Sequence, residues 1–152
     1  MRALGASREQ LGAKYPGLKL VAEKVADGQA ATGHNIMIDL ITANPDLRGV
    51  FASNLIMTQG VGQAILEAKR ADTIKVIGFD SDDLTVKFVE NGTIYGLVVQ
   101  DPFRMGYEGV RTALVASRGG TVERFVDTGT NFISHPNIGG ERQQTLLNPH
   151  VK

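Results

Sequence analysis

Short apolar segments alternate with helical segments along this chain, and this alternation limits the possible folds more than any other feature. Each apolar segment has the length of a β-strand and is followed by helix signals, a pattern typical of a parallel sheet with helices packed on it. We therefore predict an α/β domain, a three-layer sandwich built on a mainly parallel sheet. The expected strands are residues 18–25, 49–52, 74–79 and 94–99.

Capping residues and helix breakers mark the expected helices. A short polar side chain accepts hydrogen bonds from the free N–H groups at a helix start, and Asn-Pro or Asn-Gly stops a helix. Asp27, Asn54 and Asp101 are placed to cap helices, and Pro102 occupies the favoured first helical position after Asp101. The expected helices are residues 5–15, 27–43, 54–70 and 102–117, together with a helix that carries Leu84 and Phe88 on one face and ends at Asn91-Gly92.

The whole chain, residues 1–152, is expected to form a single domain, because no internal repeat and no linker divides it. Beyond the helix that Gly119-Gly120 ends, residues 122–134 are expected to be mainly extended. The tail, residues 135–152, is expected to be irregular, with residues 146–149 as its one packed segment.

The composition excludes several classes of function. Of the 152 residues, 42% are hydrophobic and 21% are charged, which is a soluble globular composition. Sixteen basic and sixteen acidic residues cancel, so we expect no nucleic-acid partner. The absence of cysteine excludes disulfides, thiolate zinc sites and cysteine nucleophiles. No apolar run approaches the about twenty residues of a membrane span, and residues 1–8 lack the apolar core of a secretory signal.

Compact polar residues stand at the ends of three predicted strands. These are Asn54, Asp80 and Gln100, and Phe79 directly precedes Asp80. In an open parallel sheet, ligands bind beyond the carboxyl ends of the strands. A carboxylate accepts hydrogen bonds from adjacent hydroxyls, amides donate and accept, and a flat ring covers an apolar C–H face, so this set suits a polyol. The alternative is structural, with Asn54 and Asp80 each serving only as a helix cap.

Several motifs resemble periplasmic sugar-binding proteins of ABC transporters, of the ribose-binding type. The resemblance covers about residues 15–150 and corresponds to the C-terminal lobe of those two-lobe proteins. Its motifs are Gly49-Val50-Phe51-Ala52-Ser53-Asn54, Val76-Ile77-Gly78-Phe79-Asp80, Leu97-Val98-Val99-Gln100-Asp101-Pro102-Phe103-Arg104-Met105-Gly106-Tyr107, Val126-Asp127-Thr128-Gly129 and Leu146-Leu147-Asn148-Pro149.

The resemblance implies a set of ligand-binding residues, which are Asn54, Phe79, Asp80, Gln100 and Arg2. The family's arginine lies in an Arg-x-x-Gly-Phe pattern. Here Arg2-Ala3-Leu4-Gly5-Ala6 lacks the phenylalanine, and Arg8 is the other possible equivalent. Leu55 also stands where many relatives have aspartate after the asparagine, which leaves the sugar open and includes acyclic polyols.

The resemblance further implies a transport function without catalysis. The parent protein would be periplasmic and would deliver a monosaccharide or polyol to an ABC permease by hinge closure of two lobes. It would not be an enzyme and would need no cofactor. In relatives the helix matching residues 102–118 packs on the other lobe, so Phe103, Val110 and Leu114 would lack their usual cover here. We therefore expect a homodimer through the helix Pro102–Ser117.

Other functions remain open or are disfavoured by the sequence. Asp127-Thr128-Gly129 is the tripeptide of aspartic proteases, but those enzymes need two copies in an all-β fold, so we expect a bend. A receiver domain needs an acidic pair after its first strand and a lysine at the end of its last strand, and this chain has neither. No nucleotide-binding motif follows a strand, and the three histidines do not have the spacing of metal ligands.

Two alternatives of other classes stay open at this point. One is the effector domain of a lactose-repressor-like transcription regulator, which has a similar fold but also an N-terminal helix-turn-helix that is not found here. The other is a lobe that binds no ligand and only associates with itself.

Overall fold

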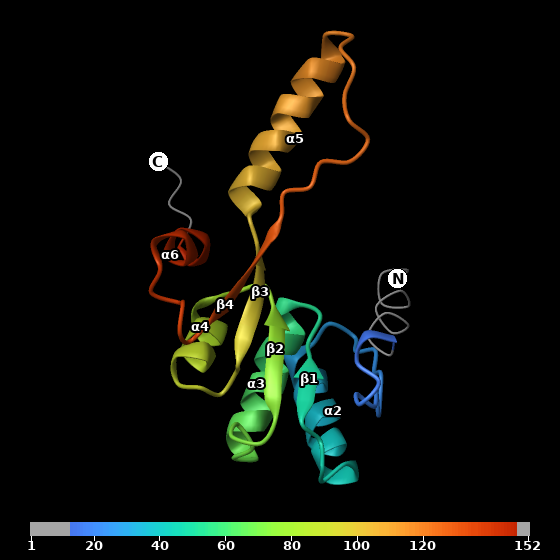
Figure 1. Cartoon of the computed structure of the whole chain (residues 1–152), viewed down its shortest axis with the longest axis vertical. Helices are drawn as coiled ribbons and strands as arrows, with labels where there is room; N and C mark the ends of the chain where they lie inside the picture. Colours follow the sequence, from blue (N-terminus) through green and yellow to red (C-terminus); the bar gives the residue numbers. More distant parts are fainter. Residues whose placement is uncertain (1–12, 149–152) are drawn as a thin grey trace.

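A four-stranded sheet forms the centre of the molecule, in a computed structural model that describes residues 13–148. The strands lie side by side in chain order (Figure 1) and are β1 (Gly49–Phe51), β2 (Lys75–Phe79), β3 (Gly96–Gln100) and β4 (Thr130–Ser134). The pairs β1–β2 and β2–β3 are parallel, and β3–β4 is antiparallel. The predicted α/β fold with a mainly parallel sheet is therefore confirmed.

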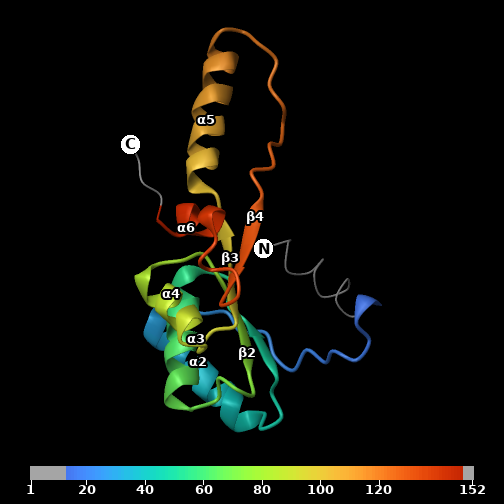
Figure 2. The same ribbon diagram turned by 60° about the vertical axis from the view of Figure 1, so that its left-hand side comes forward.

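Three helices cover one face of this sheet, as Figures 1 and 2 show together. They are α2 (Ala30–Ala43), α3 (Leu55–Glu67) and α4 (Asp83–Glu90). Alternate strand residues point toward them, so Val76, Leu97 and Ile133 are fully buried and form the core with Met37 and Ile65. No helix within residues 13–148 is both long and apolar enough to cross a membrane.

The opposite face of the sheet carries the alternate residues and is more exposed. Phe51 pairs with Ile77, and Phe132 pairs with Val98, so these side chains share that face. Phe51 is 54% exposed and Phe132 is 44% exposed. Within residues 13–148, β1 is the first strand in the sheet order and pairs only with β2. Of the predicted buried strand, residues 49–52, Ala52 is buried and Val50 is partly buried, whereas Gly49 and Phe51 are exposed.

Glycines set how closely α3 approaches its neighbours. A Cβ atom built on Gly60 would collide with the Ala30 carbonyl oxygen and would lie 2.8 Å from the backbone nitrogen of His34, both on α2. A Cβ atom on Gly62 would lie 2.5 Å from the ring of Phe88 on α4. The lack of a side chain at these two positions therefore lets α3 lie tightly between its two neighbouring helices.

Residues 18–25 do not form the strand that was predicted there. The segment has no regular secondary structure, and Leu18, Leu20 and Val25 are exposed. A strand needs hydrogen bonds from a neighbour, and the described sheet ends at β1 without this segment. The prediction that Asp27 caps α2 is also wrong, because Gln29 is the N-cap of that helix. Asp27 Oδ1 instead accepts a hydrogen bond from the Gln29 backbone N–H at 3.1 Å.

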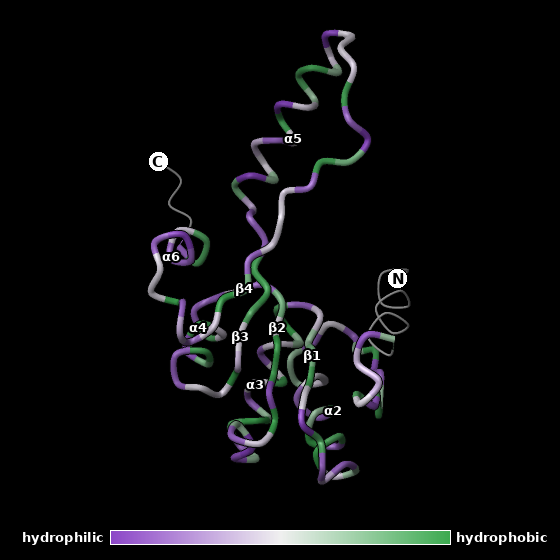
Figure 3. Tube along the Cα trace, in the orientation of Figure 1, coloured by the Kyte–Doolittle hydropathy of each residue, from purple (hydrophilic) through white to green (hydrophobic). Residues whose placement is uncertain are grey.

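The helix α5 (Pro102–Ser117) stands clear of the sheet (Figures 1 and 2) and has no buried residue. Hydrophobic and hydrophilic residues recur along it (Figure 3), and Phe103 and Val110 are 68% and 73% exposed. The predicted lack of cover on this helix is therefore confirmed. The chain returns to the sheet at Thr130, after a bend in which Asp127 Oδ1 accepts a hydrogen bond from the Gly129 N–H.

The C-terminal part is more ordered than predicted. Of residues 122–134, which were expected to be mainly extended, only Thr130–Ser134 form a strand. The tail predicted to be irregular contains α6 (Glu141–Leu147), whose Leu146 is buried as the expected packed residue. The short length of α6 explains why composition alone did not reveal it, because seven residues give little helical periodicity.

Candidate functional site

Asp80 and Gln100 lie together at the carboxyl edge of the sheet. Gln100 ends β3, Asp80 directly follows β2, and the two strands are parallel neighbours. The Gln100 Nε2 group donates a hydrogen bond to Asp80 Oδ1 at 2.8 Å, and the Asp80 N–H donates to the Val98 carbonyl at 2.9 Å. The two polar strand ends that the sequence placed at one edge are thus joined directly.

Asp80 has an unusual backbone conformation for a residue with a side chain. Its φ angle is +63°, in the left-handed region that non-glycine residues rarely adopt. The alternative that Asp80 is only a helix cap is wrong, because Asp82 caps α4 and accepts from the Thr85 N–H at 2.9 Å. The Asp80 carboxylate is therefore left for Gln100 and for whatever lies beyond the sheet edge.

Asn54 lies just after β1 and is the N-cap of α3. Its Oδ1 accepts a hydrogen bond from the Met57 N–H at 2.9 Å, so the predicted capping role is confirmed. The residue is exposed. The cap uses only the oxygen of the side-chain amide, and the Nδ2 group, a donor of two hydrogen bonds, has no partner among the described residues.

Phe79, the last residue of β2, lies between these polar groups in the chain and is half-buried. Its N–H donates a hydrogen bond to Thr58 Oγ1 at 3.1 Å. Arg2 and Arg8, the two arginines considered for the ligand set, lie outside the described residues.

Two residues of α3 that sequence reasoning missed hold the strand ends in place. Thr58 is fully buried and donates from Oγ1 to the Asn54 carbonyl at 2.8 Å. Gln59 donates from Nε2 to Asp82 Oδ2 at 2.6 Å. The available signal was a polar threonine four residues after the cap, on the helix face that also carries Val61 and Ile65.

The Asp82 carboxylate is held in its charged form. Partial burial opposes ionisation, but hydrogen bonds from the Thr85 backbone, the Thr85 hydroxyl and the Gln59 amide outweigh it and lower the pKa of Asp82. These bonds fix the loop that follows Asp80.

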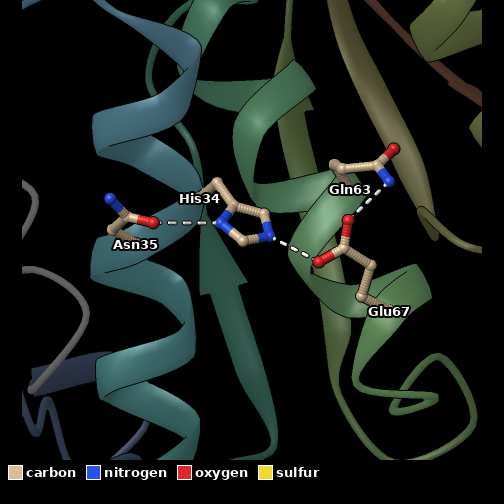
Figure 4. Close-up of polar contacts among 4 residues, drawn as sticks. All are labelled: His34, Asn35, Gln63 and Glu67. Carbon is tan, nitrogen blue, oxygen red and sulfur yellow. Dashed lines mark hydrogen bonds and ion pairs between the residues drawn. The ribbon is translucent and has the colours of Figure 1, made fainter.

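A second polar cluster lies away from the strand ends, between α2 and α3 (Figure 4). His34 Nε2 lies 2.8 Å from Glu67 Oε2, and Gln63 donates to the other Glu67 oxygen at 2.8 Å. The hydrogen bonds to Glu67 and Asn35 raise the pKa of His34, and those from Gln63 and His34 lower the pKa of Glu67. The cluster links the two helices, because His34 lies on α2 and Glu67 lies at the end of α3.

The candidate site is an open edge rather than an enclosed cavity. A hollow of about 610 Å³ lies along α5 and another of about 300 Å³ lies between Asp101 and α6, and neither is lined by the four predicted ligand residues. Between residues 13 and 148, no group of three metal-ligating side chains is close enough to hold an ion.

The fold is an open α/β sheet, and Asp80 and Gln100 lie at its carboxyl edge, where ligands bind in sheets of this class. The chain belongs to the family described as the periplasmic binding protein domain, whose model matches residues 2–121. The ribose import binding protein RbsB of Escherichia coli is 35% identical over 104 residues, which are 68% of this chain and 35% of that protein.

Two solved structures are similar over almost the whole chain. A carbohydrate transporter solute binding protein from Agrobacterium radiobacter, in complex with D-arabinose, is 61% identical with a TM-score of 0.87, and the match covers 93% of this chain and 48% of that one. An ABC transporter solute binding protein from Agrobacterium vitis with bound D-fucose is 33% identical with a TM-score of 0.86, covering 95% and 49%.

This chain therefore spans about a third of the curated relative and about half of each solved chain. These relatives are transport solute-binding proteins and not enzymes, in agreement with the prediction from sequence.

Proposed function

We propose that this chain is the C-terminal-type lobe of a sugar-binding protein and that it contributes Asn54, Phe79, Asp80 and Gln100 to the ligand cleft. The observation that carries the proposal is the hydrogen bond between Gln100 and Asp80, which fixes a carboxylate and an amide side by side at the sheet edge. Arginine at position 2 belongs to the same proposal by family resemblance.

Each group has a distinct role toward a monosaccharide or polyol. Asp80 Oδ2, which the bond to Gln100 leaves open, accepts a hydrogen bond from one ligand hydroxyl. The side-chain amide oxygen of Gln100, Oε1, accepts from another. Asn54 Nδ2 donates, because its oxygen already caps α3. The half-buried ring of Phe79 covers the apolar C–H face of the sugar. No bond is made or broken in this scheme.

The second half of the cleft belongs to a first lobe, as expected from the length of the relatives. In the whole protein the lobes close around the ligand by a hinge movement that is stabilised by contacts made only in the closed state. The closed form delivers the sugar to an ABC permease. We place this function in the periplasm, because the family is that of periplasmic binding proteins and the D-allose-binding periplasmic protein of Escherichia coli is a relative of this chain.

Titration calorimetry of the chain with D-ribose, D-arabinose, D-fucose and an alditol tests the proposal. We expect weak binding of at least one ligand at millimolar concentration, because half a cleft makes half of the contacts. Asp80→Ala should abolish that heat, while Asp72→Ala, an exposed residue before the other end of β2, should not change it. Absence of heat with all four ligands would overturn the binding role of this chain.

We also propose, for the isolated chain, a homodimer through the apolar stripe on α5. Phe103, Tyr107, Val110 and Leu114 line the 610 Å³ hollow along one side of the helix, and no element of the described chain covers them. Val110→Glu should dissociate the dimer in sedimentation experiments, and the control Val25→Glu, equally exposed but remote in sequence, should not. A strictly monomeric profile at high concentration would overturn this proposal.

A further inference from the structure

One buried hydroxyl connects two polar strand ends of the candidate site. Thr58 lies in the first turns of α3 and is fully buried. Its Oγ1 donates to the Asn54 carbonyl at 2.8 Å and accepts from the Phe79 N–H at 3.1 Å. A single side chain thus joins the residue after β1 to the residue before Asp80.

The hydroxyl takes the place of a missing strand partner. The pairing between β1 and β2 ends with Phe51 opposite Ile77, and the last bond on that side runs from the Ala52 N–H to the Ile77 carbonyl. The Phe79 N–H, two residues further, has passed the end of β1. Thr58 satisfies this donor, which would otherwise be left without an acceptor in a partly buried position.

Gly78 makes the close approach of Thr58 possible. A Cβ atom on Gly78 would collide with the Thr58 methyl group and would lie 2.8 Å from Oγ1 and from the Leu97 side chain. The strand therefore presents bare backbone to the threonine. Gln59, the next residue on α3, donates a hydrogen bond to Asp82 and so holds the loop beyond Asp80 against the same helix.

We propose that Thr58 is a positioning residue of the sugar site, which sets the separation between Asn54 on one side and the pair Phe79 and Asp80 on the other. This inference rests on the proposed function for its ligand. Thr58 does not reach the sheet surface itself, since it is completely buried, so it acts through the residues that it holds.

Two conservative substitutions distinguish the role of the Thr58 hydroxyl from the role of its methyl group in packing. Thr58→Val keeps the branched shape and removes the hydroxyl, whereas Thr58→Ser keeps the hydroxyl and removes a methyl group. Thermal unfolding of both variants shows that they fold, and amide hydrogen exchange then reports on Phe79. The second measurement is the dissociation constant for whichever of D-ribose, D-arabinose and D-fucose binds the unmodified chain.

We expect Thr58→Val to increase the exchange rate of the Phe79 amide. It should also weaken sugar binding about tenfold, because the strand end that carries Phe79 and Asp80 is then no longer held in its binding position before the ligand arrives. The amides of Val76 and Leu97 in the sheet centre should keep their protection. Thr58→Ser should retain both the Phe79 protection and the affinity, even if its unfolding temperature falls. Rescue by serine is what a purely packing role would not produce.

Three results would overturn the inference, and they are distinguishable. Unchanged exchange at Phe79 in Thr58→Val would show that the hydroxyl does not hold the strand end. Altered exchange with unchanged affinity would show a tether without influence on the site. No binding of any sugar by the unmodified chain would remove the proposed function and the positioning role with it, while the exchange data would still establish the tether.

Discussion

Gln100 and Asp80 belong to neighbouring parallel strands, and the amide of the first donates to the carboxylate of the second at 2.8 Å. The bond fixes the rotamers of both side chains before any ligand arrives. Ordering a side chain on binding costs about 0.5–1.5 kcal/mol, so a pair that is already ordered lowers this cost. One carboxylate oxygen and one amide oxygen stay free to accept from hydroxyls.

The left-handed backbone of Asp80 predicts effects of different size for two substitutions that remove the same bond. Asp80→Ala and Asp80→Gly both lose the contact with Gln100, but only glycine adopts a φ of +63° without steric cost. We expect Asp80→Gly to be more stable than Asp80→Ala by about 1 kcal/mol in urea unfolding. Equal stability of the two variants would contradict strain at this position.

Gly60 predicts a large effect of one methyl group at the contact of α2 and α3. A Cβ atom there meets the Ala30 carbonyl, so Gly60→Ala should lower the free energy of unfolding by about 1–3 kcal/mol. Gly109→Ala is the matched control, because it lies in α5 with no atom near its Cβ position and should be neutral or stabilising by up to about 1 kcal/mol. Similar losses in both variants would show that helix packing is not the cause.

His34 predicts a stability contribution that depends on pH. Its pKa is raised above the ordinary value of 6.5 by the hydrogen bond to Glu67, so protonation favours the folded state. The contribution is fully present below about pH 6.5 and is lost as the pH rises through the folded pKa. In thermal unfolding, His34→Gln should therefore lower the midpoint more at pH 5.5 than at pH 8.5.

Glu67→Gln is the control for that experiment, since it removes the partner charge and keeps the side-chain length. The pH-dependent part of the His34→Gln effect should be small in this background. If His34→Gln lowers the unfolding midpoint of the unmodified chain by the same amount at pH 5.5 and pH 8.5, the pairing shown in Figure 4 is contradicted.

The exposure of α5 predicts low local stability. The helix has no buried residue, whereas α3 buries six, including Ala64 and Ile65. We expect backbone amides of α5 to be protected from hydrogen exchange about a hundredfold less than those of α3 at low concentration. Protection of α5 should rise with protein concentration if the proposed dimer forms, and equal protection in the two helices would contradict an independent α5.

Features encoded within a few residues of one another were predictable from the sequence. The caps Asn54 and Asp101 follow from local chemistry, and the apolar runs around Val76 and Val98 formed the expected strands. Parallel pairing then brought Asp80 and Gln100 to one edge. These predictions needed only local propensity and one topological rule.

Features that depend on a partner were not predictable in the same way. Residues 18–25 have the composition of a strand, but composition does not supply the neighbour that a strand requires. The contact of Thr58 with the Phe79 N–H joins positions twenty-one residues apart and arises only where β1 stops before β2. No local pattern marks the residue at which one strand outlasts the next.

The free edge of β1 makes the size of this sheet a property of its surroundings. Among residues 13–148, β1 has β2 as its one neighbour, so backbone donors and acceptors on its other side can pair with an extended segment that arrives in a compatible direction. A strand supplied next to β1 would close this edge. Gly49–Phe51 is thus the border of the described sheet at which a further strand can add.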